Sequence, residues 1–192
     1  MRKINHIVIH CSATRENTDF SFEDLKQAHK ARGFRTVGYH FYIRKDGSVH
    51  IGRPIHQTGA HVKGHNHDSI GIAYEGGLDA NGRPKDTRTE LQEAAIIDTI
   101  RELFEKLAEY QDISTIEILG HRDLSPDLDG DGVVESHEWL KQCPCFDALK
   151  EYAWMKGMNI GCHCKKRKLQ TKSLEHRHRA NYFDRGDCDH FH

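Results

Sequence analysis

Two histidines far apart in the chain, His10 and His121, and a later Lys141-Gln142-Cys143 tripeptide carry the side chains best suited to chemistry. Zinc accepts imidazole nitrogen and thiolate sulfur, and a set of three protein ligands leaves a fourth position open for water. An open position is typical of catalytic zinc, whereas structural zinc sites are usually closed by four ligands. These side chains therefore suggest a zinc hydrolase. No local spacing rule supports the set, because its members are far apart and the chain has 16 histidines.

A second metal-binding pattern lies between His121 and Cys143. Residues 127–138 match the calcium-loop pattern D-x-[DN]-x-[DN]-G-x₅-E, in which the seventh residue supplies a backbone carbonyl and the twelfth a bidentate carboxylate. The expected calcium ligands are Asp127, Asp129, Asp131, Val133 and Glu138. Pro126 leaves no room for an entering helix, although Glu135 to Leu140 could begin an exiting one. The alternative is an acidic surface turn without an ion.

Three short runs predict the strands that would position these side chains. Ile7 to Cys11 is apolar and rich in β-branched residues, which is typical of a buried strand, and His10 lies near its end. Ser69 to Tyr74 predicts a second strand, and Ile113 to Leu119 predicts a third that ends at Gly120-His121. Two of the three runs thus end at or beside a candidate zinc ligand.

A hairpin and two helices complete the pattern. Tyr39 to Arg44 and Val49 to Ile51 are joined by an Asp-Gly turn, which is typical of a hairpin. Ser21 to Asp24 resembles a capping box and begins a helix that runs to Arg32-Gly33. Thr89 to Tyr110 predicts a longer helix with one broad apolar face formed by Leu91, Ala94, Ala95, Ile97, Ile100, Leu103, Phe104 and Leu107. Alternating strands and helices predict an α/β fold with a central mixed β-sheet flanked by helices.

Length and composition favour one domain with a tail. A chain of 192 residues suits one ordinary core, and a net charge of -1 gives no general attraction to nucleic acid or to an anionic membrane. The apolar run at the N-terminus is too short for a signal peptide, so the six cysteines favour metal binding or free thiols over disulfides. After Trp154 the apolar period is lost, and residues 155–192 predict a flexible, basic, His/Cys-rich tail. The alternative for the tail is a metal-buffering or nucleic-acid-binding arm.

Four segments carry a family resemblance. They are His10-Cys11-Ser12-Ala13-Thr14; Val37-Gly38-Tyr39-His40-Phe41; the stretch from Thr58-Gly59-Ala60-His61 to Ser69-Ile70-Gly71-Ile72; and Gly120-His121-Arg122-Asp123 with Lys141-Gln142-Cys143-Pro144. Together they resemble the zinc-dependent N-acetylmuramoyl-L-alanine amidases of the phage-lysozyme and peptidoglycan-recognition-protein type. The resemblance implies one amidase domain over residues 1–154, with the calcium-loop-like segment 127–138 as an insertion.

The same resemblance implies the roles of individual residues. It gives His10, His121 and Cys143 as zinc ligands, with peptidoglycan or a muropeptide as substrate. Lys141 is expected to stabilise the oxyanion of the tetrahedral intermediate, and Tyr39 to hydrogen-bond that oxyanion or the attacking water. His61 is expected near the substrate. Cys145 competes with Cys143 as the thiolate, but the Lys-x-Cys-Pro pattern favours Cys143.

One departure from the family pattern bears on the mechanism. Some members carry a glutamate base two residues after the Ile70-Gly71 pair, where this chain has Ala73. The mechanism with Tyr39 and Lys141 is therefore favoured. The main alternative is a non-catalytic peptidoglycan-binding module of the same fold. We expect a monomer, without nucleic-acid or membrane partners, that is cytoplasmic or reaches the cell wall by lysis or another export route.

Overall fold

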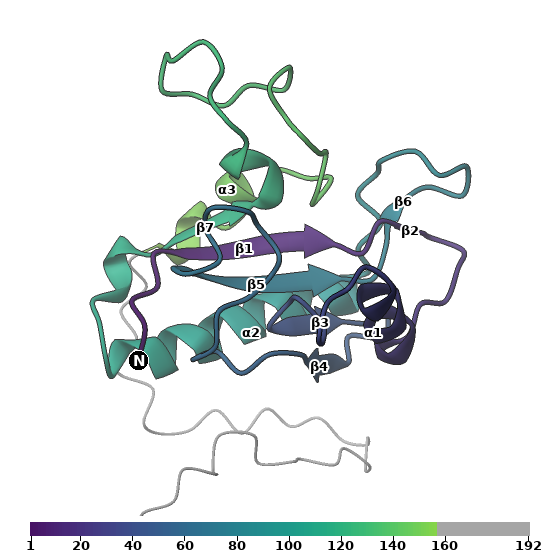
Figure 1. Cartoon of the computed structure of the whole chain (residues 1–192), viewed down its shortest axis with the longest axis horizontal. Helices are drawn as coiled ribbons and strands as arrows, with labels where there is room; N and C mark the ends of the chain where they lie inside the picture. Colours follow the sequence, from purple (N-terminus) through teal and green to yellow (C-terminus); the bar gives the residue numbers. More distant parts are fainter. Residues whose placement is uncertain (157–192) are drawn as a thin grey trace, which may run out of the picture. The chain divides into compact units, whose positions relative to one another are not determined.

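A five-stranded mixed sheet forms the centre of the computed structural model, which describes residues 1–156 (Figure 1). The strand order is β4-β3-β5-β1-β7, and only β4 runs antiparallel to its neighbour. The strands are β1 (His6–Cys11), β3 (Phe41–Ile43), β4 (Val49–Ile51), β5 (Ser69–Tyr74) and β7 (Glu117–Gly120). The prediction of an α/β fold with a central mixed sheet is confirmed.

The long helix α2 (Glu90–Ala108) packs on one face of this sheet. Thr89 caps it, and Gln92 completes a capping box by accepting from the backbone N–H of Thr89. Its buried apolar side chains are Ile96, Ile100, Leu103, Phe104 and Leu107, and they share a core with Ile7 and Ile9 of β1. The predicted apolar face was wrong at Leu91, which is 58% exposed, and at Ala94, which is also exposed. Gln92 is buried instead, because its amide donates to two strand-end carbonyls.

The opposite face of β1 carries His6, Val8 and His10, since alternate side chains of a strand point to opposite faces. Val8 packs against Val62, which belongs to the connection between β4 and β5. The short helix α1 (Phe22–Ala31) buries Leu25 against Val37 and Tyr42, and its predicted capping box between Ser21 and Asp24 is present. The C-terminal end of β1 therefore lies between the loop that carries Val62 and helix α1.

Short elements account for most differences from the sequence-based expectation. The predicted strand from Ile113 begins instead as a 3₁₀ helix, η1 (Ile113–Thr115), because the Asp112 carboxylate accepts from the N–H of Ser114. The exiting helix proposed for Glu135 to Leu140 does not form. Two-residue strands β2 (Thr14–Arg15) and β6 (Gly77–Leu78), helix α3 (Ala148–Glu151) and 3₁₀ helix η3 (Ala153–Met155) were not predicted, because such short pieces show no period.

Among the described residues, no helix is both long and apolar enough to cross a membrane. The predicted tail lies outside the described residues from position 157 onward.

Candidate metal centre

The fold brings His10, His121 and Cys143 together. His10 lies near the end of β1, and His121 opens the 3₁₀ helix η2 (His121–Leu124) directly after β7. Because β1 and β7 are parallel neighbours, their carboxyl ends meet at one edge of the sheet, the usual place for a ligand site. Cys143 arrives from a later segment, and its carbonyl accepts from the N–H of Arg122 at 2.9 Å. The three ligand atoms lie within 4.8 Å of one another.

The donor atoms suit zinc in type and spacing. With Zn–S near 2.3 Å and Zn–N near 2.0 Å, tetrahedral geometry separates sulfur from nitrogen by about 3.5 Å. Here Cys143 Sγ lies 3.8 Å from His10 Nδ1. The same sulfur accepts from the backbone N–H of Cys11 at 3.2 Å, a contact that holds it in place. Two imidazoles and one thiolate, with an open cavity beside them, fit a zinc ion with a free coordination position.

His61 orients His10 from the side away from Cys143. Its Nδ1 lies 3.1 Å from His10 Nε2, and its Nε2 lies 3.4 Å from Ser69 Oγ. The ring fits because residue 71 is glycine, where an added Cβ would come within 2.7 Å of it. A hydrogen bond to the second nitrogen fixes the orientation of a ligating histidine. His61 lines the cavity but is only 9% exposed, so the expected substrate contact stays a prediction.

Burial sets the protonation of the ligand histidines. It lowers the pKa of His10 well below the usual value, with the nearby His61 adding to the effect. Burial, and then the charge of Lys141, lower the pKa of His121 to about 4. Both imidazoles are therefore neutral at pH 7, as ligation requires.

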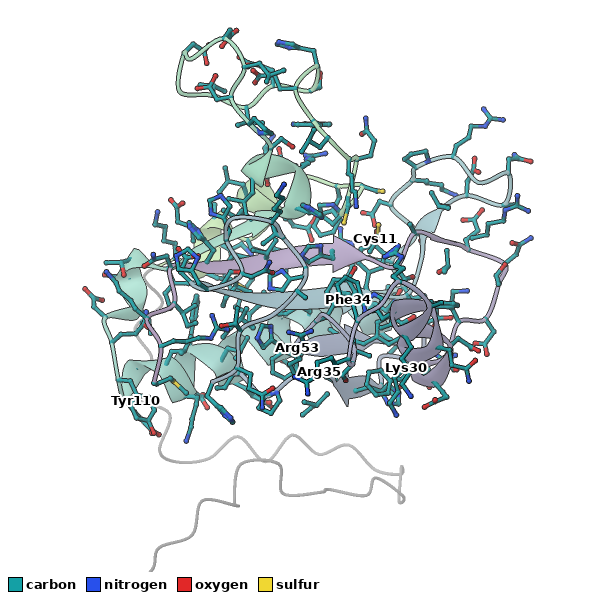
Figure 2. The ribbon with its side chains drawn as sticks, in the orientation of Figure 1. Cys11, Lys30, Phe34, Arg35, Arg53 and Tyr110 are labelled. Carbon is teal, nitrogen blue, oxygen red and sulfur yellow. The ribbon has the colours of Figure 1, made fainter. Side chains whose placement is uncertain are left out.

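A cavity of about 250 Å³ opens beside these three side chains. Tyr39 and Lys141 line it, so every residue of the predicted zinc and catalytic sets lies at one site. The Tyr39 ring packs against His10 and His29, and burial raises the pKa of its phenol, which therefore stays protonated. Lys141 is exposed. Figure 2 labels Cys11 at the end of β1 and Phe34 beside α1, two further residues of the cavity wall.

The end of α1 supplies cavity residues that the sequence did not indicate. Ala28, His29 and Arg32 line the cavity together with Phe34. His29 Nδ1 accepts from the N–H of Gly38 at 2.9 Å, which ties the helix to the segment that carries Tyr39. The spacing of Leu25, Ala28 and His29 on one helical face was the available signal, but it indicated only packing.

The family's glutamate position is filled by an apolar side chain. Ala73 is fully buried and pairs with His10 across β1 and β5. The nearby Glu75 carboxylate is held elsewhere, because it accepts from the N–H of Phe20 at 2.7 Å and from Arg44 Nε at 2.6 Å. Neither residue offers a base to the cavity. This geometry supports the mechanism with Tyr39 and Lys141.

The other two described cysteines lie beside the centre. Cys145 Sγ points toward the carbonyl of Gly77 at 3.1 Å and lies 3.9 Å from Cys11 Sγ. Contact with Cys143 and burial raise the pKa of Cys11 to about 12. Cys145 is absent from the His10 group, whose sulfur comes from Cys143, as the Lys-x-Cys-Pro pattern favoured.

The acidic loop 127–138 folds without an α-helix directly on either side, although the 3₁₀ helix η2 ends at Leu124. Asp127 accepts from the N–H groups of Gly130 and Gly132 at 2.7 and 2.9 Å, and Gly132 has a φ of 90°, as the predicted turn requires. The carboxylates divide into two groups that share Asp129, one with Asp127 and Asp131, the other with Glu135, His137 and Glu138. The calcium site stays a prediction, and Val133 as a carbonyl ligand with it.

Comparisons with known proteins identify the family and several relatives of the chain. The family model of N-acetylmuramoyl-L-alanine amidase matches residues 1–144. An endolysin of Enterobacteria phage K11 is 34% identical over 158 residues, which are 81% of this chain and 87% of the phage protein. An endolysin of Klebsiella phage KP32 is 36% identical over 155 residues, which are 81% and 88% of the two chains.

Solved structures share the fold. The N-acetylmuramoyl-L-alanine amidase LysC from Clostridium intestinale is 28% identical, with a TM-score of 0.57 over 80% of this chain and 86% of that one. Bumblebee PGRP-SA is 21% identical, with a TM-score of 0.61 over 81% and 84% of the two chains, which shows the fold alone. The chain belongs to the N-acetylmuramoyl-L-alanine amidase family.

Proposed function

We propose that this chain hydrolyses the amide that joins the lactyl group of N-acetylmuramic acid to the L-alanine of the peptidoglycan stem peptide. The observation that carries the proposal is the meeting of His10, His121 and Cys143 in the wall of a cavity that Tyr39 and Lys141 also line. Membership of the amidase family and relatives named endolysin support the same substrate. Residues 1–154 would form the amidase domain, and 127–138 an insertion within it.

Zinc held by His10, His121 and Cys143 would supply a water with a pKa near 7 and polarise the substrate carbonyl. The reaction adds the water oxygen to the carbonyl carbon, breaks the carbon–nitrogen bond and passes a proton to the alanine nitrogen. His61 keeps His10 oriented throughout, since its Nδ1 lies 3.1 Å from His10 Nε2. Cys11 holds the Cys143 sulfur through its N–H.

Tyr39 and Lys141 would act on the substrate oxygen. Lys141 lines the cavity as a cation near the ligands, where it would stabilise the developing oxyanion. Burial keeps the Tyr39 phenol protonated, so it can donate a hydrogen bond to the same oxygen. Such stabilisation is effective in a transition state when the donors are already in place before the charge develops.

The rival function is peptidoglycan binding without hydrolysis. Peptidoglycan-recognition proteins share the fold, so the fold itself does not separate the two functions. Cys143 favours hydrolysis, because its sulfur lies among the ligand atoms of the His10 group. We further propose that the protein acts on the cell wall, as relatives named endolysin suggest, and that it is a monomer.

The deciding experiment is mass spectrometry of isolated peptidoglycan digested with the purified chain. Release of stem peptides with a free alanine amino group is expected, and Cys143→Ser should abolish it. Cys145→Ser is the matched control, because it removes a neighbouring sulfur outside the ligand group and should keep release. A protein that sediments with peptidoglycan but releases no stem peptide would instead be the binding module.

A further inference from the structure

A second group of metal-ligating side chains lies at the opposite end of the sheet from His10. His6, His65 and Asp68 place ligand atoms within 4.8 Å of one another. His6 begins β1, whereas His10 lies near its end, and at about 3.3 Å per residue the two are about 13 Å apart along the strand. This cluster is therefore separate from the proposed catalytic centre, and nothing in the proposed hydrolysis uses it.

We infer that His6, His65 and Asp68 form a second binding site for a divalent transition metal, with Zn²⁺ as the expected occupant. Two imidazoles and a carboxylate are a common zinc donor set, and they leave a fourth position for water. Imidazole nitrogen favours zinc over magnesium or calcium, which select oxygen donors. The site does not depend on the proposed function.

Two buried polar atoms of this group lack a hydrogen-bond partner. His6 Nδ1 and Asp68 Oδ1 are buried and make no hydrogen bond among the described residues. Between the two side chains, His6 Nε2 lies 4.0 Å from Asp68 Oδ2, which is too long for a hydrogen bond. Burial lowers the pKa of His6 even though Asp68 opposes the shift, so the imidazole is neutral at pH 7. A metal bound through His6 Nδ1 and Asp68 Oδ1 would satisfy both of these buried atoms, which the 4.0 Å contact between Nε2 and Oδ2 leaves without a partner.

The backbone that presents the ligands is already fixed. The N–H groups of Asn5 and His6 donate to the Asp68 carbonyl at 2.7 and 3.2 Å, and the Asn5 amide donates to Asp68 Oδ2 at 3.0 Å. Arg2 donates to the carbonyls of His67 and Ser69 at 3.0 and 2.7 Å. Tetrahedral zinc needs its nitrogen and oxygen ligands about 3.3 Å apart, so small side-chain rotations would suffice to close the site.

One loop joins the two metal groups. His61 contacts His10, Val62 packs on Val8, and the His65 ring lies 5.9 Å from the His6 ring. Residues 61–65 therefore follow β1 from one end to the other on a single face of the sheet. A metal bound to His65 and His6 would link this loop to β1. It would thereby restrict the movement of the His61 ring, which orients His10. The expected effects are a higher melting temperature and a more firmly held His61.

The test is a zinc titration of the full chain after the first equivalent has bound. Ring ¹⁵N resonances of His6 and His65 should shift with the second equivalent, and the melting temperature should rise. His65→Ala and Asp68→Asn should each abolish the rise; the first removes a ring without a hydrogen bond of its own, and the second can keep the contact with Asn5. His56→Ala, an exposed histidine outside the group, is the matched control and should behave like the parent.

His6 and His65 resonances that stay unshifted when zinc is added in excess beyond the first equivalent would overturn the inference. A rise in melting temperature that survives in both variants would also overturn it, because the ion would then bind elsewhere. Should a variant fail to fold, the resonances of the parent protein still decide. Since hydrolysis is not a readout, failure here leaves the proposed function untouched.

Discussion

The His10 group and the acidic loop 127–138 are both predicted metal sites, but the fold prepares them differently. His10 and His121 come from neighbouring buried strands, and His10 is 1% exposed, held by His61 on one nitrogen. Their geometry is set by the sheet. The loop lies mostly at the surface. Both carboxylate oxygens of Asp127 accept hydrogen bonds from backbone N–H groups of its own turn. Its geometry is set by the loop alone.

This difference separates what an ion would do in each place. At the His10 group, two neutral imidazoles and a cysteine sulfur place their ligand atoms within 4.8 Å of one another. In the loop, internal hydrogen bonds already satisfy several carboxylate oxygens, so a cation would compete with them as well as relieve charge repulsion. The first group should therefore bind tightly, and the second, if it binds calcium, more weakly.

The largest expected effect comes from breaking the His10 group. His121→Ala should lose both the tightly held zinc and the release of stem peptides, because two protein ligands hold zinc far less well than three. Metal content after dialysis and the peptidoglycan digest measure the two losses. Cys145→Ser should keep zinc and activity. If Cys145→Ser loses zinc while Cys143→Ser retains it, the assignment of the sulfur ligand is wrong.

The next effect separates chemistry from metal binding within the same region. Lys141→Ala should keep zinc and substrate affinity but lower kcat by about 10²-fold, since an oxyanion contact acts mainly in the transition state. Tyr39→Phe should behave similarly, because it removes only the hydroxyl. Steady-state kinetics together with metal content decide, and a variant with unchanged kcat would remove that residue from the mechanism.

A smaller effect is expected at His61, for which two roles compete. As the orienting partner of His10, His61→Ala should weaken zinc binding by about 10–100-fold, and His61→Asn should restore part of it by offering an oxygen near the place of Nδ1. As a substrate contact, the same change should raise KM and leave zinc affinity unaltered. Zinc competition with a chelator, beside the kinetics, distinguishes the two roles.

Sequence-based prediction of strands and site residues was most accurate where the local motif and the hydrophobic period agree with the tertiary packing. Ser69–Tyr74 was predicted residue for residue, since every position of that strand is buried. The zinc set was found through four family segments, and no spacing rule would have linked His10 to Cys143. His29 and the His6–His65–Asp68 group were missed because only the folded sheet brings their partners close. Ile113 was misassigned because a local Asp112–Ser114 hydrogen bond outweighed strand propensity.

The smallest expected effect tests the loop. Asp127, Asp129 and Asp131 lie within 4.8 Å of one another, and a bound calcium would offset their mutual repulsion. An ion that binds only the folded state stabilises by about 2.7 kcal/mol at one hundred times its Kd, which would raise the melting temperature of a chain of this size by about 5–10 °C. We predict a rise of this order in millimolar calcium for protein first stripped of metal, measured by calorimetry.

Two variants and one control make the loop prediction specific. Asp129→Ala removes the carboxylate shared by both acidic groups, and Glu138→Ala removes a nearly buried one that accepts from the N–H of Glu135. Both should abolish the calcium-dependent rise, whereas Asp98→Ala, an exposed aspartate on α2, should keep it. Activity should fall modestly in the two loop variants, because the loop leads into Lys141 and Cys143. If calcium leaves the melting temperature of the parent protein unchanged, the loop is an acidic turn without an ion. The two regions would then differ as a metal site differs from a loop whose carboxylates are satisfied by internal hydrogen bonds.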